Sequence, residues 1–233
     1  MKTIRGFYLV MLLLTGSLTL LISSCKKEED DTLTDIDGNT YTTVTIGTQV
    51  WMAGNLKVTR FNDGTDIPLV TEKTAWSSTS GAAYCWYDNN ISNKDPYGAL
   101  YNWHAVNSSK ICPKGWKVPS ESEWKVLVNF LGGESVAGGK LKTTGTIEAG
   151  DGLWYQPNVG ATNETGFSIV PGGYRGASGT FFDFGYGGVW WTSTAYPSDL
   201  AYYFYINNYN GEVGDSDTGI DKKSGLSVRC LKE

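Results

Sequence analysis

Four cysteines and a single histidine are the side chains with the most distinctive chemistry in this 233-residue chain. The cysteines stand far apart in the sequence, at Cys25, Cys85, Cys112 and Cys230. One histidine excludes a zinc site built on several histidines and leaves no spare histidine for a Ser-His-Asp relay. His104 has helical spacing to Tyr97, Leu100 and Tyr101, so we expect a hydrogen-bonded position at the edge of the core.

Two stretches carry oxygen ligands of the kind that calcium prefers. Gln156-Pro157-Asn158 is similar to the Gln-Pro-Asp piece of sugar-binding C-type lectins, but it ends in an amide and no Trp-Asn-Asp follows. Residues 215–221, DSDTGID, lack the glycine position and distal glutamate of an EF-hand loop. We therefore expect no metal site and no cofactor, with a weakly held structural calcium as the alternative at that polar turn.

Aromatic side chains are the remaining candidates for ligand contact. Residues 174–209 are dense in Tyr, Phe and Trp, and strand alternation along residues 201–206 would direct some of them outward. Exposed aromatic clusters mark glycan or protein contact sites. The predicted contact residues are Tyr174, Arg175, Phe181, Trp190, Trp191, Tyr203 and Tyr205. Core packing is the alternative role for the two tryptophans, and the glycine-rich stretch 172–188 is expected to be a surface loop.

A capped helix is predicted to begin after Ser120, and it is the clearest of the elements that must position these residues. Ser120 precedes Glu123 by three residues, which is a capping box, so both Glu121 and Glu123 are expected to serve the helix start. Apolar residues follow at helical spacing to Leu131, and Gly132-Gly133 can end the helix. A first helix is predicted over 96–106. Short strands are predicted over 41–46, 49–52, 81–87, 166–170, 172–175, 188–193, 201–206 and 225–230.

The first 34 residues predict export. Residues 1–24 carry Lys2 and Arg5 before an apolar run, which is the layout of a signal peptide. Leu21 to Cys25 resembles the lipobox of bacterial lipoproteins, which implies acylation of Cys25; an uncleaved membrane anchor is the alternative. Residues 25–34 are predicted to be a solvated tether, and their acidic run is similar to the export signal of surface lipoproteins in Bacteroidetes. The expected location is the outer membrane, lipid-anchored and exposed on the cell surface.

Net charge limits the possible partners. The whole chain carries −5, and removal of residues 1–24 takes away Lys2 and Arg5 and no acid, which leaves −7. Such a surface would repel phosphate backbones, and no basic cluster interrupts it. Nucleic acid is therefore excluded as an expected partner.

Several sequence pieces together carry a resemblance. They are DIDGNTYTTVTIGTQVWMAGNLK, YCWYDNN, YGALYNWHAV, CPKGWKVPSESEW, GFSIVPGGYR, GGVWWTST and GLSVRC. Their order resembles the Fibrobacter succinogenes major paralogous domain over nearly all of residues 35–233. More distantly, WKVPSESEW, WWTST and GLSVR are similar to formylglycine-generating-enzyme-like domains. The resemblance implies one α+β domain of C-type-lectin-like fold, with two helices packed on short, twisted, mostly antiparallel sheets and with the chain ends close together.

The resemblance also implies a disulfide. A C-type-lectin-like topology would bring Cys112, just before the capped helix, to Cys230 in the last predicted strand. Pairing of Cys85 with either one stays open, because connectivity does not follow from sequence alone. If Cys85 is unpaired, we expect a buried thiol that packs as a small hydrophobe. A formylglycine-generating enzyme needs two neighbouring cysteines near its C-terminal end, and here only Cys230 lies there.

The sequence therefore predicts a lipid-anchored, non-catalytic binding or display module for a polysaccharide or a partner surface protein. A structural component of a surface complex or appendage is the first alternative. An enzyme related to the formylglycine-generating group is the second.

Overall fold

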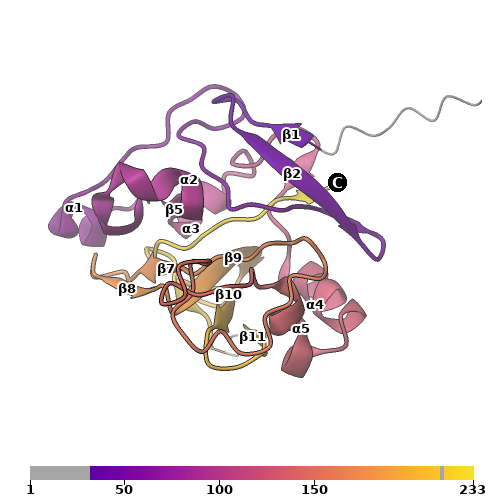
Figure 1. Cartoon of the computed structure of the whole chain (residues 1–233). Coiled ribbons are helices and arrows are strands. Elements are labelled where there is room, and N and C mark those ends of the chain that lie inside the picture. Colours follow the sequence, from indigo (N-terminus) through magenta and orange to yellow (C-terminus); the bar gives the residue numbers. More distant parts are fainter. Residues whose placement is uncertain (1–31, 216–217) are drawn as a thin grey trace, which may run out of the picture.

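A computed structural model describes residues 32–215 and 218–233 of the chain. The leader, the acylation site at Cys25 and most of the predicted tether lie outside these residues. The described part mixes helix and sheet, with sheet predominating, and its curled sheets are mainly antiparallel (Figure 1). The α+β class predicted from the sequence is confirmed at this level.

The first sheet joins the two ends of the described chain. Its strands are β1 (Thr32–Thr34), β2 (Thr40–Ile46), β3 (Gln49–Met52), β6 (Trp116–Lys117) and β13 (Leu231–Lys232), in the order β1-β2-β3-β13-β6, with all pairs antiparallel. The strands predicted over 41–46 and 49–52 are confirmed, and they pair as the β2–β3 hairpin. Thr32–Thr34, predicted as tether, instead pairs with Thr40–Thr42, because the turn at Asp35 folds the chain back. The C-terminus consequently lies beside β1 and β2 (Figure 1).

The second sheet carries most of the aromatic residues of the stretch 174–209. It contains β7 (Gly172–Arg175), β8 (Phe181–Phe184), β9 (Gly187–Ala195), β10 (Leu200–Asn207) and β11 (Gly214–Asp215), in the order β11-β10-β9-β7-β8, with β12 (Ile220–Asp221) also paired to β10. Only β7 and β9 are parallel within it. The stretch 172–188, predicted as a surface loop, is largely the β7–β8 hairpin and the start of β9. That part of the prediction is wrong, because cross-strand pairs such as Tyr174–Phe182 stabilise a hairpin despite the glycines.

The capped helix is confirmed as α4 (Glu121–Phe130). The Ser120 hydroxyl accepts from the amide of Glu123 at 3.3 Å, and the Glu123 carboxylate accepts from the amide of Ser120 at 2.9 Å. Glu121 pairs with Lys125 one turn later at 2.6 Å. The buried face of α4 packs against the second sheet, where Trp124 stacks on Phe204 with ring centroids 5.3 Å apart. Both glutamates therefore hold the helix start, as predicted.

The helix predicted over 96–106 is wrong. The chain forms α2 (Lys94–Tyr97), β5 (Leu100–Tyr101) and α3 (Trp103–Val106) instead, and β5 pairs with β4 (Tyr84–Cys85). The interruption falls at Gly98, whose φ is +78° and whose Cα packs directly on Asn55 and Leu56. Close tertiary packing thus overrides the helical spacing of the apolar side chains. His104 lies half-buried on α3. Three short helices precede this region: α1 (Lys73–Ser78), η1 (Tyr87–Asn89) and η2 (Ile91–Asn93).

A further helix, α5 (Glu134–Leu141), was not predicted because Gly138 and Gly139 weaken its helical signal. Neighbouring loops lie against these two glycines. A Cβ atom at Gly138 would collide with the backbone carbonyl of Glu212, and one at Gly139 with that of Gly160. The glycines therefore let two loops approach the helix backbone.

Replacing Gly139 by alanine is expected to lower the free energy of unfolding by about 1–3 kcal/mol, because the added methyl group meets backbone that cannot move aside. In an open helix the same change would stabilise by about 1 kcal/mol. Urea unfolding of Gly139→Ala measures the sign. Gly81→Ala, where the new Cβ meets nothing within 4 Å, is the control and is expected to be neutral or slightly stabilising. A stabilised Gly139→Ala protein would contradict the close approach.

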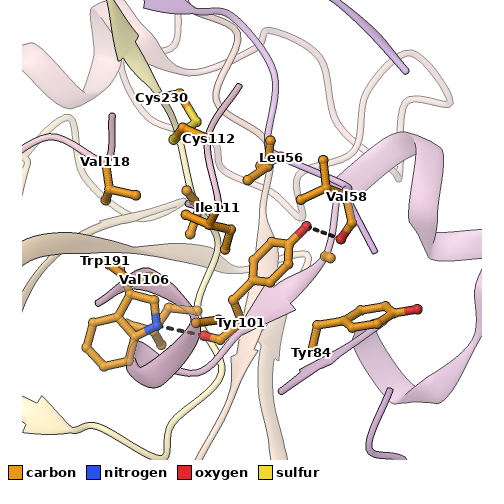
Figure 2. Packing of buried hydrophobic residues seen from close by; sticks show 14 of the residues in the cluster. Leu56, Val58, Tyr84, Tyr101, Val106, Ile111, Cys112, Val118, Trp191 and Cys230 are labelled. Atoms are coloured by element: carbon orange, nitrogen blue, oxygen red, sulfur yellow. Dashed lines mark hydrogen bonds between the residues drawn. A yellow bond between two sulfur atoms is a disulfide. The ribbon is translucent and has the colours of Figure 1, made fainter. Parts of the chain in front are cut away.

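The C-terminal segment 225–230 is buried along its whole length, and we call it the buried thread. The strand predicted there is wrong as a regular element, because each residue pairs with a different neighbour. Leu226 exchanges backbone hydrogen bonds with Tyr101, Gly225 does so with Arg175, and Ser227 bonds to β9. A disulfide joins Cys230 at the end of this thread to Cys112, so the predicted pairing is confirmed (Figure 2). Residues 166–170, also predicted as a strand, make only a single bridge, between Ile169 and Lys142.

Tyr101 lies at the centre of the largest core cluster (Figure 2). Its hydroxyl donates to the carbonyl of Val58 at 2.7 Å, and its own carbonyl accepts from the indole of Trp191 at 2.7 Å. Complete burial raises the pKa of Tyr101 well above its ordinary value of 10. In the folded protein this tyrosine therefore keeps its proton at pH values where an exposed tyrosine loses it.

Stability is expected to fall as the pH rises above 10. The unfolded chain then loses the Tyr101 proton while the folded chain retains it, so the unfolded state binds fewer protons and is favoured by increasing pH. Denaturant midpoints measured from pH 8 upward test this, and Tyr101→Phe should show a shallower alkaline decline. At neutral pH the same variant is expected to lose about 1 kcal/mol with the hydrogen bond to Val58. Identical alkaline slopes would contradict the assignment.

Candidate functional site

A hollow of about 240 Å³ lies where the β8–β9 turn meets the end of β10. We call it the tyrosine groove, and it is lined by Asp183, Tyr186, Gly187, Gly188, Val189, Tyr205, Ile206, Asn207 and Tyr209. Its three tyrosines are exposed, Tyr186 by 53%, Tyr205 by 38% and Tyr209 by 67%. Large aromatic side chains at such exposure are not needed for the core, so this surface is a candidate contact site.

The Tyr186 wall of the groove is held from behind. Tyr186 stacks on Tyr155 with ring centroids 4.6 Å apart and planes inclined by 28°. The segment that carries Tyr155 is fixed in turn by Asn208, whose side chain donates to the carbonyls of Tyr155 at 3.0 Å and Gln156 at 2.8 Å. Tyr186 is therefore positioned in advance, and ordering its side chain on ligand binding costs little entropy.

The Tyr205 wall rests on backbone. Its ring lies so close over Gly214 in β11 that a side chain at that glycine would overlap it. The neighbouring Tyr203 has its ring centroid 6.3 Å from that of Tyr205. Both aromatic walls are thus supported by side chains or backbone outside the groove, which is the arrangement expected of a preformed binding surface.

Asp183 is the one acidic side chain among the described residues that line the groove. Its φ is +59°, a left-handed conformation that aspartate tolerates better than most residues, and its carbonyl accepts from the amide of Tyr186 at 3.0 Å in the β8–β9 turn. Partial burial of the carboxyl group raises its pKa. Asp183 therefore combines a left-handed backbone conformation with a carboxylate in the lining of the groove, and such backbone conformations are common at functional sites.

A buried lysine holds the third side of the groove. The ammonium group of Lys142 donates to the carbonyls of Val159 at 2.8 Å, Asn207 at 3.0 Å and Asn210 at 2.8 Å, so its three donors are used. Burial lowers the pKa of Lys142 to about 8. The Asn207 side chain accepts from the amides of Tyr209 and Asn210, both at 3.1 Å. Together these bonds fix the loop that presents Tyr209.

Only Tyr205 of the predicted contact residues lines the groove. Tyr203 is its half-buried neighbour, and Tyr174 and Phe181 are half-buried elsewhere on the β7–β8 hairpin. Trp190 and Trp191 are 0% exposed, so the prediction that they contact ligand is wrong. They lie on β9, in the middle of the second sheet, with a core cluster on each face. The alternative role in packing is the correct one.

Arg175 is also wrong as a contact residue, because it is buried. Its guanidinium donates to the carbonyls of Gly179, Val70 and Thr71. It lies over the rings of Trp76 and Phe181, at 4.4 Å and 4.8 Å from their centroids. Arg175 therefore ties the loop at residues 70–71 to the β7–β8 hairpin.

Sequence reasoning missed Asp183, Tyr186, Asn207 and Tyr209 as members of the site. The available signal was their position at the two ends of aromatic strands, where turns expose side chains. The register that brings the β8–β9 turn beside the end of β10 follows from pairs such as Asn207–Gly187 and could not be read from composition.

The two stretches considered as calcium sites are Gln156-Pro157-Asn158 and residues 215–221. Asn158 is buried, and its amide donates to the carbonyls of Thr143 and Gly145, so it serves loop packing. Within residues 32–215 and 218–233, no three His, Cys, Asp or Glu side chains are grouped as metal ligands. Residues 216 and 217 of the stretch 215–221 lie outside the described part.

Cys85 is the free cysteine of the described chain, and it is buried, as predicted for an unpaired Cys85. Burial raises the pKa of its thiol to about 12. It belongs to a small core cluster with Trp76, Ala83 and Leu100. A protonated, enclosed thiol of this kind is a packing residue with little nucleophilic character.

Comparison with known proteins gives one family match. A family model described as the Fibrobacter succinogenes major domain matches residues 44–232. No curated protein and no solved structure matches the chain. Across the residues that the structure describes, no helix has the length and apolar character needed to cross a bilayer.

Proposed function

The chain belongs to the Fibrobacter succinogenes major domain family, and from that premise we propose that it is an exported, lipid-anchored protein that binds carbohydrate in the tyrosine groove. The observation that carries the proposal is the pair of exposed tyrosine walls, Tyr186 and Tyr205, each held from behind in a fixed position. Core packing does not explain why these two rings are exposed or why neighbouring groups hold them in place.

The chemistry of the groove suits a sugar chain. Pyranose rings present apolar C–H faces that stack on aromatic rings, and their hydroxyl groups bind to carboxylate, amide and phenol oxygens. The groove offers Tyr186, Tyr205 and Tyr209 for stacking, with Asp183 and Asn207 for hydrogen bonding. Gly187, Gly188, Val189 and Ile206 complete the lining of the hollow. A mostly apolar hollow with a few placed polar groups is the usual form of a small-ligand site.

The proposal includes a C-type-lectin-like fold. Three observations support it: the first and last described strands share one sheet, α4 packs on a curled second sheet, and a disulfide ties the last segment to the start of α4. Lipid attachment at Cys25 and display at the outer membrane are proposed from the leader and the lipobox-like stretch. The tyrosine groove lies on the second sheet, whereas β1, the first described strand, belongs to the first sheet.

We propose a non-catalytic role. The buried Cys85 thiol and the bonded Cys112 and Cys230 leave no described cysteine free for nucleophilic or copper chemistry. His104 stands on α3, away from the residues that line the tyrosine groove. Binding and display of a glycan require no more than the groove provides.

A glycan array with the purified protein, followed by titration calorimetry on the best ligand, tests the proposal. Tyr186→Ala and Tyr205→Ala are each expected to weaken binding by about tenfold to a hundredfold, because each removes one stacking wall. Tyr196→Ala is the matched control, since Tyr196 packs on Tyr202 outside the groove. The control is expected to bind like the unaltered protein.

Two results would contradict the proposal. One is an array without any bound glycan, combined with co-purification of a fixed surface protein, which would favour a structural component of a surface complex. The other is glycan binding that survives both groove substitutions and falls in Tyr196→Ala.

A further inference from the structure

We infer that the tyrosine groove selects sugars that carry an ammonium group, so that its preferred ligands are glucosamine-containing chains. This inference rests on the carbohydrate-binding function proposed above and names the substrate class. It follows from the charges around the groove and from the geometry of its aromatic walls.

The charged side chain among the described lining residues is acidic. None of the described residues that line it is basic, and Asp183 is acidic. Glu212 and Asp215 stand close enough to Tyr205 for their negative charges to raise the pKa of its phenol, with burial as the larger cause. The nearest cations are occupied elsewhere: Lys142 bonds to three carbonyls beneath the loop, and Lys125 pairs with Glu121 and Asp215. An ammonium group in the groove would therefore meet the Asp183 carboxylate, and no lysine or arginine side chain lines the hollow to neutralise that charge.

The aromatic walls add a second attraction for a cation. Tyrosine rings carry negative charge on their faces, and an ammonium group set against several such rings is attracted more strongly where water is partly excluded. Tyr186, Tyr205 and Tyr209 surround the hollow, with the Asp183 carboxylate at its edge. Rings around a carboxylate form a site for an organic cation, and the same rings can stack on the sugar that carries it.

Three β-1,4-linked hexamers test the inference, because they share a backbone and differ at carbon 2. They are the hexamers of glucosamine, N-acetylglucosamine and glucose, and hexagalacturonate serves as an anionic ligand. At low salt the glucosamine hexamer is expected to bind about tenfold more tightly than the glucose hexamer, because of ion pairing and cation–π attraction. Hexagalacturonate is expected not to bind. High salt should reduce the preference, since it screens the Asp183 charge.

Asp183→Asn separates charge recognition from sugar stacking. Asparagine also tolerates a positive φ, so the turn should be retained. This variant is expected to lose most of the preference for the glucosamine hexamer and to keep the part that the tyrosine rings supply, whereas Tyr205→Ala is expected to weaken binding of both hexamers. Choline is the ammonium control without a sugar and is expected to compete only at millimolar concentration.

The possible outcomes test the ammonium preference separately from carbohydrate binding. Tyrosine-dependent binding of all neutral and amino sugars with equal affinity would overturn the ammonium preference and leave carbohydrate binding intact. Choline binding as tight as that of the glucosamine hexamer would overturn the sugar assignment. Absence of binding to every hexamer would overturn both.

Discussion

Replacing Cys112 and Cys230 together with alanine is expected to lower the free energy of unfolding by about 4–5 kcal/mol. The disulfide closes a loop between residues separated by 118 positions, and its loss increases the conformational freedom of the unfolded chain. It also joins the buried thread at residues 225–230 to the segment before α4. Urea unfolding of the double variant, read by tryptophan fluorescence, measures the loss.

Reduction of the unaltered protein is the control for this double variant, because it breaks the same bond without changing the side-chain volume. Both forms are expected to show the same shift of the urea midpoint. An unchanged midpoint in both would show that the bond is not formed or that the unfolded chain is already constrained there.

Replacing Arg229 with methionine is expected to cost about 3–5 kcal/mol, because several buried acceptors lose their donor. The guanidinium is fully buried, and it pairs with no carboxylate of residues 32–215 or 218–233. It donates to the Asn55 side chain at 2.9 Å, to the carbonyls of Met52 and Ser168 at 3.3 and 2.9 Å, and to the carbonyl of Phe167. Asn55 accepts from the indole of Trp190 at 2.9 Å and donates to the carbonyl of Tyr97 at 2.8 Å, so the disturbance would spread.

Two further variants make the Arg229 experiment specific. Arg229→Lys keeps the charge but lacks the planar fork, and it is expected to lose nearly as much stability as the methionine variant. Arg60→Met removes the half-exposed partner of Asp37 and is expected to cost about 1 kcal/mol or less. A loss at Arg229 no larger than that at Arg60 would contradict a central role for the buried guanidinium.

Buried cations bonded to carbonyls recur in this fold and have a common physical reason. Lys142, Arg175 and Arg229 each donate to backbone carbonyls of irregular segments. Much of the chain lies outside regular helices and sheets, so these carbonyls need donors other than the backbone. Long cationic side chains supply several donors each and tie distant loops together.

Local sequence signals predicted the elements that depend on local interactions. The capping box at Ser120 and Glu123 and the β2–β3 hairpin follow from residues within a few positions of one another. The pairing of Cys112 with Cys230 came from the family resemblance. Elements decided by distant packing were not predicted. The break at Gly98 depends on Asn55 and Leu56, and the glycines of α5 are explained only by the loops that lie on them.

In the candidate site, too, local sequence patterns predicted some features and missed those that depend on distant packing. The alternation of side chains along β10 predicted that Tyr205 points outward. The same alternation would also direct one tryptophan of β9 outward, but Trp190 and Trp191 are both buried, because other elements cover both faces of the sheet at β9. The glycine-rich sequence around Arg175 predicted an exposed side chain. Its burial follows from tertiary contacts, in which the guanidinium donates to three backbone carbonyls. The groove itself forms from register between β9 and β10, which single-sequence patterns do not contain.

The most direct test of carbohydrate binding in the tyrosine groove is an NMR titration of the purified protein, labelled at its tyrosine rings, with the glucosamine hexamer. The account predicts saturable shifts of the Tyr186, Tyr205 and Tyr209 ring resonances, with those of Tyr196 unchanged. Shifts confined to tyrosines outside the groove, or no shifts with any of the hexamers, would contradict it.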